Sequence, residues 1–213
     1  MNRDQENIDR FNRLALEWDE KPLHVETAAA IAEAMLAALH LRGSERVFEF
    51  GAGTGLLTVH LAPHCRSLLA MDSSPDMLAV LRRKSAAFSL SNVTVIEGMV
   101  PADVPKGPFA LICSSLTLHH IEDSAALFGA LFRRLAPGGR VTFADLEAED
   151  GSFHGDVAGV AHHGFAPEPL RALLQEAGFR DVRFSPAHII RRESDAGEQR
   201  PYPVFLVVAA KPG

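Results

Sequence analysis

The sequence predicts an α/β protein, built on a mostly parallel β-sheet with helices on both faces. Short apolar runs alternate with helical segments from about residue 46 to residue 177, the pattern of repeated β-α-β units. The first of these runs, 46–50, passes through three glycines at alternate positions into an apolar helical segment. At 213 residues and 47% hydrophobic, the chain can bury one core of this kind.

Each element follows from periodicity and from turn residues. Residues 3–18 read as a helix with one apolar face, and a second helix covers about 26–40. Strands are expected at about 46–50, 67–71, 92–96, 109–113, 140–144, 180–186 and 203–210, and helices at about 54–62, 75–88, 123–136 and 167–177. Ser74 can cap a helix whose first residue is Pro75. We find no internal repeat.

The glycine loop after the first strand is the most informative motif. Gly51, Gly53 and Gly55 leave no Cβ in the way of a ligand that approaches the backbone. Asp72 ends the next apolar run, 17 residues after Gly55. An acid at the tip of the second strand can accept both hydroxyls of a ribose. The two features predict a nucleoside-containing cofactor over the ends of the first two strands.

The spacing of the loop indicates which cofactor binds. A dinucleotide fingerprint would be G-x-G-x-x-G, whereas here Leu56 stands where its last glycine belongs. A carboxylate at Glu49 suits a ligand with an ammonium or sulfonium group and disfavours a pyrophosphate. The loop and Asp72 together resemble the first two motifs of class I S-adenosylmethionine-dependent methyltransferases. A nicotinamide enzyme and a glycine-rich turn without a ligand are the alternatives.

The resemblance covers roughly residues 8–210 and is strongest to the ubiquinone/menaquinone-biosynthesis-like subgroup, the type 11/12 methyltransferase domain. The matching segments are Met71–Leu78, Phe109–Asp123, Leu135–Arg140 and Gln175–Phe179. It implies a Rossmann-like fold whose seven-stranded sheet is mostly parallel with an antiparallel last strand. It also implies a single domain over 1–213, with a helical cap over 1–42 and a lid insertion over 146–166.

By the same resemblance, S-adenosylmethionine is the cofactor and S-adenosylhomocysteine the product. The residues expected to bind it are Trp18, Glu49, Gly51, Ala52, Gly53, Gly55, Asp72, Ser73, Met99 and Ser114. Met99 departs from the family pattern, because many relatives place an acid there to meet the adenine amino group. Methionine can pack against the ring instead. The amino group would then meet Glu97, a backbone carbonyl or water.

The acceptor side is less defined. The segment 145–165 carries Asp145, Glu147, His154, His162 and His163, which could converge above the sulfonium. The histidines could act as a general base, ligate a metal, or simply build the lid. We take His154 and His162 as the candidate catalytic residues and expect no metal. At least one residue of the pair His119-His120 should lie near the methyl group.

The net charge and the cysteine content limit the kinds of partner that the protein can bind. A net charge of −6 argues against a nucleic-acid partner, and two cysteines give neither a disulfide framework nor a zinc pattern. We see no signal peptide and no apolar run of membrane-spanning length, so a cytoplasmic protein is expected. Motifs of amino-methylating and cytosine-5 enzymes are also missing, which favours a small-molecule acceptor. We expect a monomer or homodimer. A protein that binds the cofactor without transferring its methyl group is the alternative function.

Overall fold

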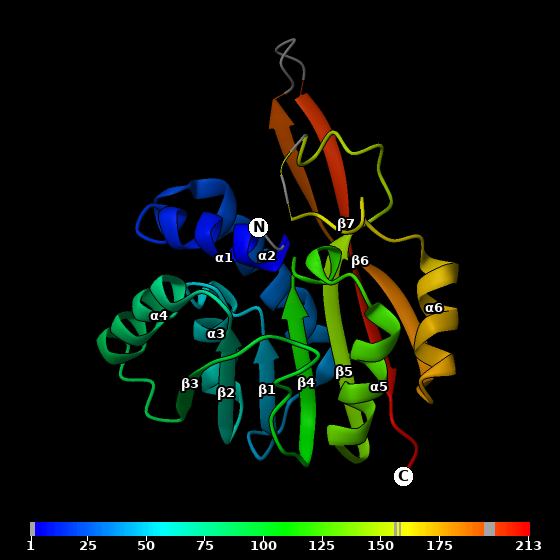
Figure 1. Cartoon of the computed structure of the whole chain (residues 1–213). Helices are drawn as coiled ribbons and strands as arrows, with labels where there is room; N and C mark the ends of the chain where they lie inside the picture. Colours follow the sequence, from blue (N-terminus) through cyan, green and yellow to red (C-terminus); the bar gives the residue numbers. More distant parts are fainter. Residues whose placement is uncertain (1–2, 156, 158, 194–198) are drawn as a thin grey trace.

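A computed structural model describes residues 3–155, 157, 159–193 and 199–213, and a seven-stranded sheet forms its centre (Figure 1). The strands are β1 (Arg46–Phe50), β2 (Ser67–Asp72), β3 (Val93–Glu97), β4 (Phe109–Ser115), β5 (Leu135–Leu146), β6 (Arg180–Glu193) and β7 (Gln199–Ala210). Their order is β3-β2-β1-β4-β5-β7-β6. Strands β1 to β5 pair in parallel, and β7 runs antiparallel to both of its neighbours. The predicted fold class is confirmed.

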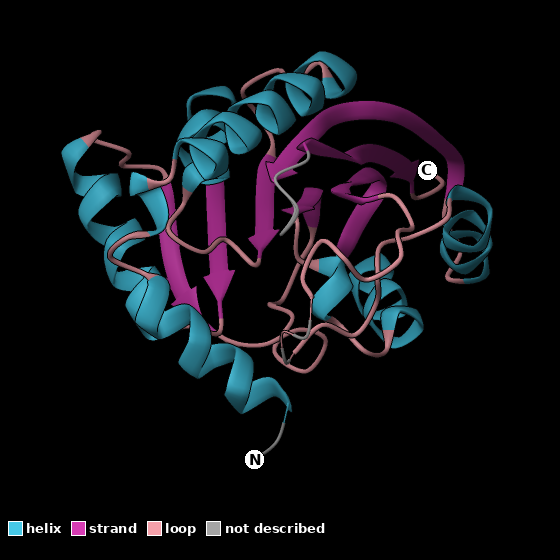
Figure 2. Cartoon of the chain, turned by 90° about the horizontal axis from the view of Figure 1, so that it is seen from above, coloured by secondary structure: helices cyan, strands magenta, loops and turns pink. Residues whose placement is uncertain are grey.

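Helices cover both faces of the sheet (Figure 2). One core contains α2 (Pro22–Leu39), α3 (Leu56–Leu61) and α4 (Pro75–Ala87), and the other contains α5 (Ser124–Arg134) and α6 (Pro167–Glu176). Strand β1 alternates between them, since Val47 packs in the first core and Phe48 and Phe50 pack in the second. A parallel sheet buried on both faces needs this near-continuous apolar run.

The helix starts follow the predicted chemistry. The Oγ of Ser74 accepts the backbone N–H of Met77 at 3.2 Å, and Pro75 is the first residue of α4. Asp123 caps α5 by accepting the N–H of Ala126 at 2.8 Å. Both caps satisfy a donor that the first helical turn leaves unpaired. They also fix the loops that follow β2 and β4, where the site lies.

The predicted cap over 1–42 divides into two parts. Helix α1 (Arg3–Leu14) and the 3-10 turn η1 (Trp18–Glu20) lie above the carboxyl ends of the strands. Helix α2 instead packs on the sheet, where Ile31, Met35 and Leu39 are buried. By length and composition α2 meets the criterion for a membrane span. This corrects the expectation that no segment does, although its exposed face carries Glu26 and Glu33.

The last two strands are longer than the sequence suggests. They extend beyond the expected ranges 180–186 and 203–210 as a two-stranded arm that rises above the sheet (Figure 1). The hydrophobic pattern did not predict these extensions, because they contain Arg191, Arg192 and Pro201, which are not typical of a buried strand. The expected lid over 146–166 lacks regular helices, and a single bridge from Glu147 to Phe165 closes its base. Residues 156 and 158 of that lid lie outside the described part of the chain.

Candidate cofactor and acceptor site

A cavity of about 790 Å³ opens at the carboxyl ends of the strands. Its volume lies in the range of small-molecule and cofactor sites. The elements around it are α1, α2, the glycine loop, the ends of β2 and β4, the lid and the β6 arm. Seven of the ten residues predicted to bind the cofactor line it: Trp18, Gly51, Ala52, Gly53, Asp72, Ser73 and Met99.

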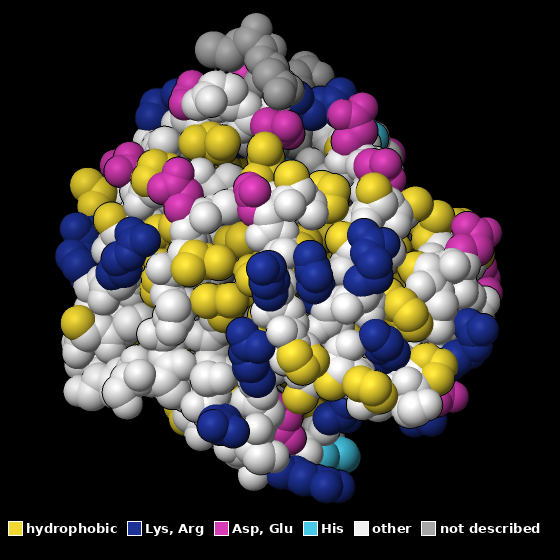
Figure 3. Space-filling model, turned by 60° about the horizontal axis from the view of Figure 1, so that its bottom comes forward, with side chains coloured by type: hydrophobic (Ala, Val, Ile, Leu, Met, Phe, Trp, Pro, Cys, Tyr) yellow, Lys and Arg dark blue, Asp and Glu magenta, His cyan; other side chains and the backbone are white. Residues whose placement is uncertain are grey.

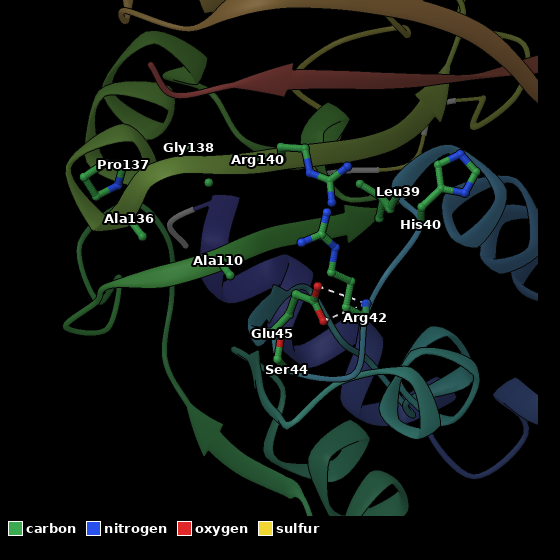
Figure 4. A pocket seen from close by; sticks show the side chains of 11 residues that line it. Leu39, His40, Arg42, Ser44, Glu45, Ala110, Ala136, Pro137, Gly138 and Arg140 are labelled. Carbon is green, nitrogen blue, oxygen red and sulfur yellow. Dashed lines mark hydrogen bonds between the residues drawn. The ribbon is translucent and has the colours of Figure 1, made fainter. Parts of the chain in front are cut away.

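A second hollow of about 460 Å³ lies at the opposite edge of the sheet (Figure 4). The guanidinium groups of Arg42 and Arg140 face each other there. None of the predicted site residues lines it. Lys and Arg side chains are also prominent on this face of the molecule (Figure 3), so the net charge of −6 does not describe every surface.

The glycine loop has the geometry that close approach requires. Gly51, Gly53 and Gly55 all have positive φ, at 65°, 54° and 83°. A Cβ on Gly51 would stand 2.2 Å from Oγ1 of Thr117, whereas no atom lies within 4 Å of the Cβ position of Gly53. The loop is therefore packed against Thr117 at Gly51 and open at Gly53, and all three residues line the cavity.

Asp72 organises the loops on either side of it. One carboxylate oxygen accepts the N–H of Gly53 at 2.8 Å, and the other accepts the N–H of Ser74 at 2.9 Å. Burial raises the pKa of Asp72, and these backbone donors act in the opposite direction. Each oxygen keeps a lone pair for a further donor. The carboxylate can therefore hold the loop and accept ribose hydroxyls together.

Three predicted contacts are not made in the cavity. Glu49 and Ser114 are each only 1% exposed and do not line it, and Gly55 does not line it either. The Oε2 of Glu49 accepts the Thr58 hydroxyl at 2.8 Å, and burial raises the pKa of Glu49 to about 8. It points into the α2-α3-α4 core because it alternates with Phe48 and Phe50.

Ser114 and Gly55, the other two predicted residues that do not line the cavity, also have structural roles. The hydroxyl of Ser114 donates to the carbonyl of Phe50 at 2.8 Å, which ties β4 to β1. Gly55 begins α3, and a Cβ there would stand 2.1 Å from Cδ1 of Leu81. Both residues shape the loop from below.

The N-terminal elements close the cavity and are attached to the cofactor loops. Asp19 accepts the Thr54 hydroxyl at 2.6 Å and pairs with Lys84 of α4 at 2.6 Å. Asn12 of α1 accepts the Ser74 hydroxyl at 2.6 Å. A cofactor that orders the loops would thus also order these N-terminal elements.

Trp18 sits in this closing layer. Its ring lies 4.0 Å from that of His24 and 5.7 Å from that of Phe11, measured between centroids. All three residues line the cavity. The placement agrees with a role over the cofactor rather than in the core.

A buried His–Asp pair lies at the other end of the cavity. Nδ1 of His119 is 2.7 Å from Oδ1 of Asp145, and the two residues are 3% and 0% exposed. Burial alone would raise the pKa of Asp145, but the His119 ring and the N–H of Leu146 lower it below its ordinary value. An ionised Asp145 accepts a hydrogen bond from the Nδ1–H group of His119. Nε2 of the neutral ring then carries no proton and has a free lone pair. The arrangement can orient an imidazole as a proton acceptor.

His120 and His154 stand beside this pair. The ring centroid of His119 is 4.1 Å from that of His120 and 4.7 Å from that of His154. Burial, with the nearby His119 ring, lowers the pKa of each of the two neighbours to about 3. Nδ1 of His120 donates to the carbonyl of Gly159 at 3.0 Å, which docks the lid. Both rings are therefore neutral around pH 7.

The predicted convergence of 145–165 is wrong for most of its members. His162 does not line the cavity, because its Nε2 lies 2.9 Å from the carbonyl of Ile121. His163 instead faces Glu149 at 3.7 Å, and Glu147 is exposed. Only His154 of the predicted catalytic pair reaches the cavity.

The three clustered histidines could in principle hold a metal ion. His119, His120 and His154 each offer a ring nitrogen within 4.8 Å of the others, and Asp145 and the Gly159 carbonyl would be outer partners. The positive charges of Arg10 and Arg192 act on His154 and oppose a further cation there, whereas the charge of Asp145 acts in the opposite direction.

Sequence reasoning missed two kinds of site residue. The pairing of His119 with Asp145 could have been found, because His119 follows β4, Asp145 lies near the end of β5, and the register of these two strands places Ser115 beside Ala144. Arg10 and Arg192 also line the cavity. Nothing in the local sequence marked these two arginines as site residues, because Arg10 lies on an amphipathic helix and Arg192 lies on the part of β6 that the sequence did not predict.

Comparison with known proteins agrees with this site. A model of the methyltransferase domain family matches residues 2–183. An uncharacterized methyltransferase of Schizosaccharomyces pombe is 32% identical over 64% of this chain, which spans only 54% of that protein. A ubiquinone biosynthesis O-methyltransferase of Xanthomonas euvesicatoria is 28% identical over 83% of this chain and 81% of its own.

The fold has solved counterparts as well. The structure of a DhpI–S-adenosylhomocysteine complex superposes with a TM-score of 0.73, covering 98% of this chain and 96% of that one at 22% identity. The predicted family and cofactor are thereby confirmed. The chain belongs to the methyltransferase domain family, as a class I methyltransferase that depends on S-adenosylmethionine.

Proposed function

We propose that this protein transfers the methyl group of S-adenosylmethionine to a hydroxyl or amine of a small molecule. The observation that carries the proposal is the His119–Asp145 pair, which faces a cavity whose other end has the cofactor loop. A sulfonium methyl group needs an aligned nucleophile and exclusion of water. A base is needed when that nucleophile must lose a proton.

The cofactor half of the proposal assigns each residue a task. Asp72 accepts the ribose hydroxyls, Gly53 offers open backbone to the methionine portion, and Met99 packs against the adenine. Met99 is 39% exposed, and an adenine ring packed against it would cover this apolar side chain. Trp18 closes the cavity above the cofactor.

The acceptor half assigns the base to His119 rather than to His154 or His162. A base works best with a pKa near the operating pH, which the neutral His154 with its pKa of about 3 does not meet. His162 is turned to the carbonyl of Ile121. His154 and His120 would then shape the acceptor pocket around the reacting atom.

Two pairs of variants test the two halves. Asp72→Ala should weaken binding of S-adenosylhomocysteine in calorimetry by about 10-fold or more, because charge-assisted hydrogen bonds are lost. Asp76→Ala, a nearby exposed carboxylate on α4, is its control. Equal affinity in both variants would refute the ribose assignment.

For the base, acceptors are first identified by mass spectrometry, with methyl-labelled cofactor and a pool of small metabolites. His119→Asn should then cut turnover by about 100-fold or more while cofactor binding is kept. His162→Asn is the matched control and should turn over like the wild type. Wild-type turnover in His119→Asn would remove the base from the proposal, and absence of any methylated product would favour the binding-only alternative.

We further propose a monomer or homodimer in the cytoplasm, organised as one domain over 1–213, with no nucleic-acid partner. The acidic Glu26 and Glu33 on the exposed face of α2 support an aqueous environment for that helix. Cell fractionation tests the cytoplasmic location, and light scattering with the tag-free protein tests the oligomeric state. Recovery in the membrane fraction would contradict the cytoplasmic location.

A further inference from the structure

Positive side chains gather on the acceptor side of the cavity, in a chain whose net charge is −6. Arg10 of α1, Lys21 and Arg192 of β6 all line it. The acidic lining residues are engaged elsewhere: Glu122 pairs with Arg3 at 3.5 Å, Asp123 caps α5, and Asp72 holds the glycine loop. Asp4 also has interactions of its own. The lining thus places three cationic side chains around the acceptor chamber, although four carboxylates line the cavity as well.

Arg10 has a donor with no acceptor. Its Nη1 is buried and has no hydrogen-bond partner among the described residues. The guanidinium stacks over the ring of Phe11, with Cζ 5.4 Å from the centroid. Burial, and then the charge of Arg192, lowers the pKa of Arg10. A buried N–H without a partner costs free energy, and an anion would remove that cost.

Arg192 of β6 lines the same cavity, and its charge acts on Arg10. Its Nη1 donates to the carbonyl of Phe153, and Cζ lies 4.8 Å from the centre of the Phe153 ring. These contacts hold the guanidinium in place while other N–H groups remain for a ligand. Two guanidinium groups that repel one another across a cavity form a site for a negatively charged group.

We propose that the methyl acceptor carries a carboxylate or phosphate group, which binds between Arg10 and Arg192. The proposal rests on the function proposed above and specifies its substrate class. Guanidinium groups match both anions through paired hydrogen bonds.

The remaining walls fit this assignment. Phe11, Trp18, His24 and Phe153 line the same part of the cavity and offer flat apolar surfaces beside the charges. The ring of His154 contacts that of Phe153 at 4.7 Å and that of His119 at 4.7 Å, between centroids. These ring contacts connect the walls around the arginines to His119. The anionic group would thus lie in the same chamber as the nucleophile that faces His119.

Trp18 provides the measurement, because it is the only tryptophan of the chain. The protein is saturated with S-adenosylhomocysteine and titrated at constant ionic strength with benzoate, phenyl phosphate and inorganic phosphate, and with neutral benzamide. We expect saturable changes of emission with the anions and none with benzamide. Arg10→Gln and Arg192→Gln should each weaken the anion response by about 10-fold or more.

Two control variants remove the same charge nearby. Arg13→Gln changes an exposed residue of α1, and Arg191→Gln changes the neighbour of Arg192 on the opposite side of β6. Both should titrate like the wild type. An equal response to benzamide, no saturable response to any of the three anions, or an equal loss in the control variants would overturn the proposal.

A further titration separates the acceptor from the cofactor, whose methionine portion also carries a carboxylate. If Arg10→Gln and Arg192→Gln lost affinity for S-adenosylhomocysteine but kept it for methylthioadenosine, the arginines would bind the cofactor's carboxylate, and the acceptor assignment would be wrong. If the wild type bound no S-adenosylhomocysteine, the proposed function itself would fail. The two failures are therefore distinguishable.

Discussion

Glu49 provides the sharpest test of the electrostatics in this fold. Its carboxyl group is 1% exposed, has one hydrogen-bond donor in Thr58, and has a pKa raised to about 8 from 4.5 by burial. The folded protein therefore keeps a proton that the unfolded chain releases. The stability that this proton contributes is complete below pH of about 4.5 and is lost as the pH rises through about 8.

The magnitude follows from the two pKa values. Between pH 5 and pH 8 the linkage relation gives a loss of about 3–4 kcal/mol in the free energy of unfolding from this one group. Glu49→Gln keeps the shape and the Thr58 contact but cannot ionise. The difference in unfolding free energy between wild type and variant should therefore change by about this amount across the interval, in favour of the variant at high pH.

Urea unfolding of the cofactor-free protein at four pH values measures this difference, since all other titrating groups cancel between wild type and variant. Glu33→Gln, which removes an exposed carboxylate from α2, is the control and should follow the wild type in parallel. Parallel curves for Glu49→Gln as well would refute the reasoning, because they would mean that the buried carboxyl group is ionised throughout.

Three further predictions follow from packing and charge. Cys65 and Cys113 are buried, with pKa values raised by burial, to about 11 for Cys65, so Ellman's reagent at pH 8 should modify them only after denaturation. Gly159→Ala should lower the free energy of unfolding by about 1–3 kcal/mol in urea titration, because φ is +92° and the new Cβ would lie 1.9 Å from Oδ1 of Asn7. Turnover should survive dialysis against EDTA, because Arg10 and Arg192 oppose a cation at the histidines; loss restored by zinc would contradict this.

Most of the residues predicted to bind the cofactor line the cavity, because the parts of this motif are local. Gly51 and Asp72 are 21 residues apart, and each sits at the end of an apolar run that marks a strand. The directions of side chains were less predictable. Glu49 was expected at the ligand, yet the alternation of β1 turns it into the core beside Thr58. A motif locates a residue along the chain, but the face on which it lies depends on strand register.

The acceptor side was poorly predicted because it is assembled from distant segments. His119 meets Asp145 across two strands, and Arg10 and Arg192 line the same cavity although they come from opposite ends of the chain. The expected grouping of His154 with His162 failed because the backbone of 161–162 docks on the carbonyl of His119, which turns the His162 ring toward Ile121. Irregular segments carry no periodicity from which such a turn could be foreseen.

This division has a physical cause that bears on function. In the proposed cofactor site, the backbone N–H groups of Gly53 and Ser74 hold the Asp72 carboxylate, and the sheet fixes the position of this group at the end of β2. The acceptor chamber instead depends on the docking of α1, the lid and the arm, and the Gly159 carbonyl joins two of these by accepting both Asn7 and His120. Changes in those three elements can replace Arg10 or Arg192 without disturbing Asp72. Acceptor choice can therefore vary while the cofactor site stays constant, and the two arginines are the residues at which a change of acceptor class should first appear.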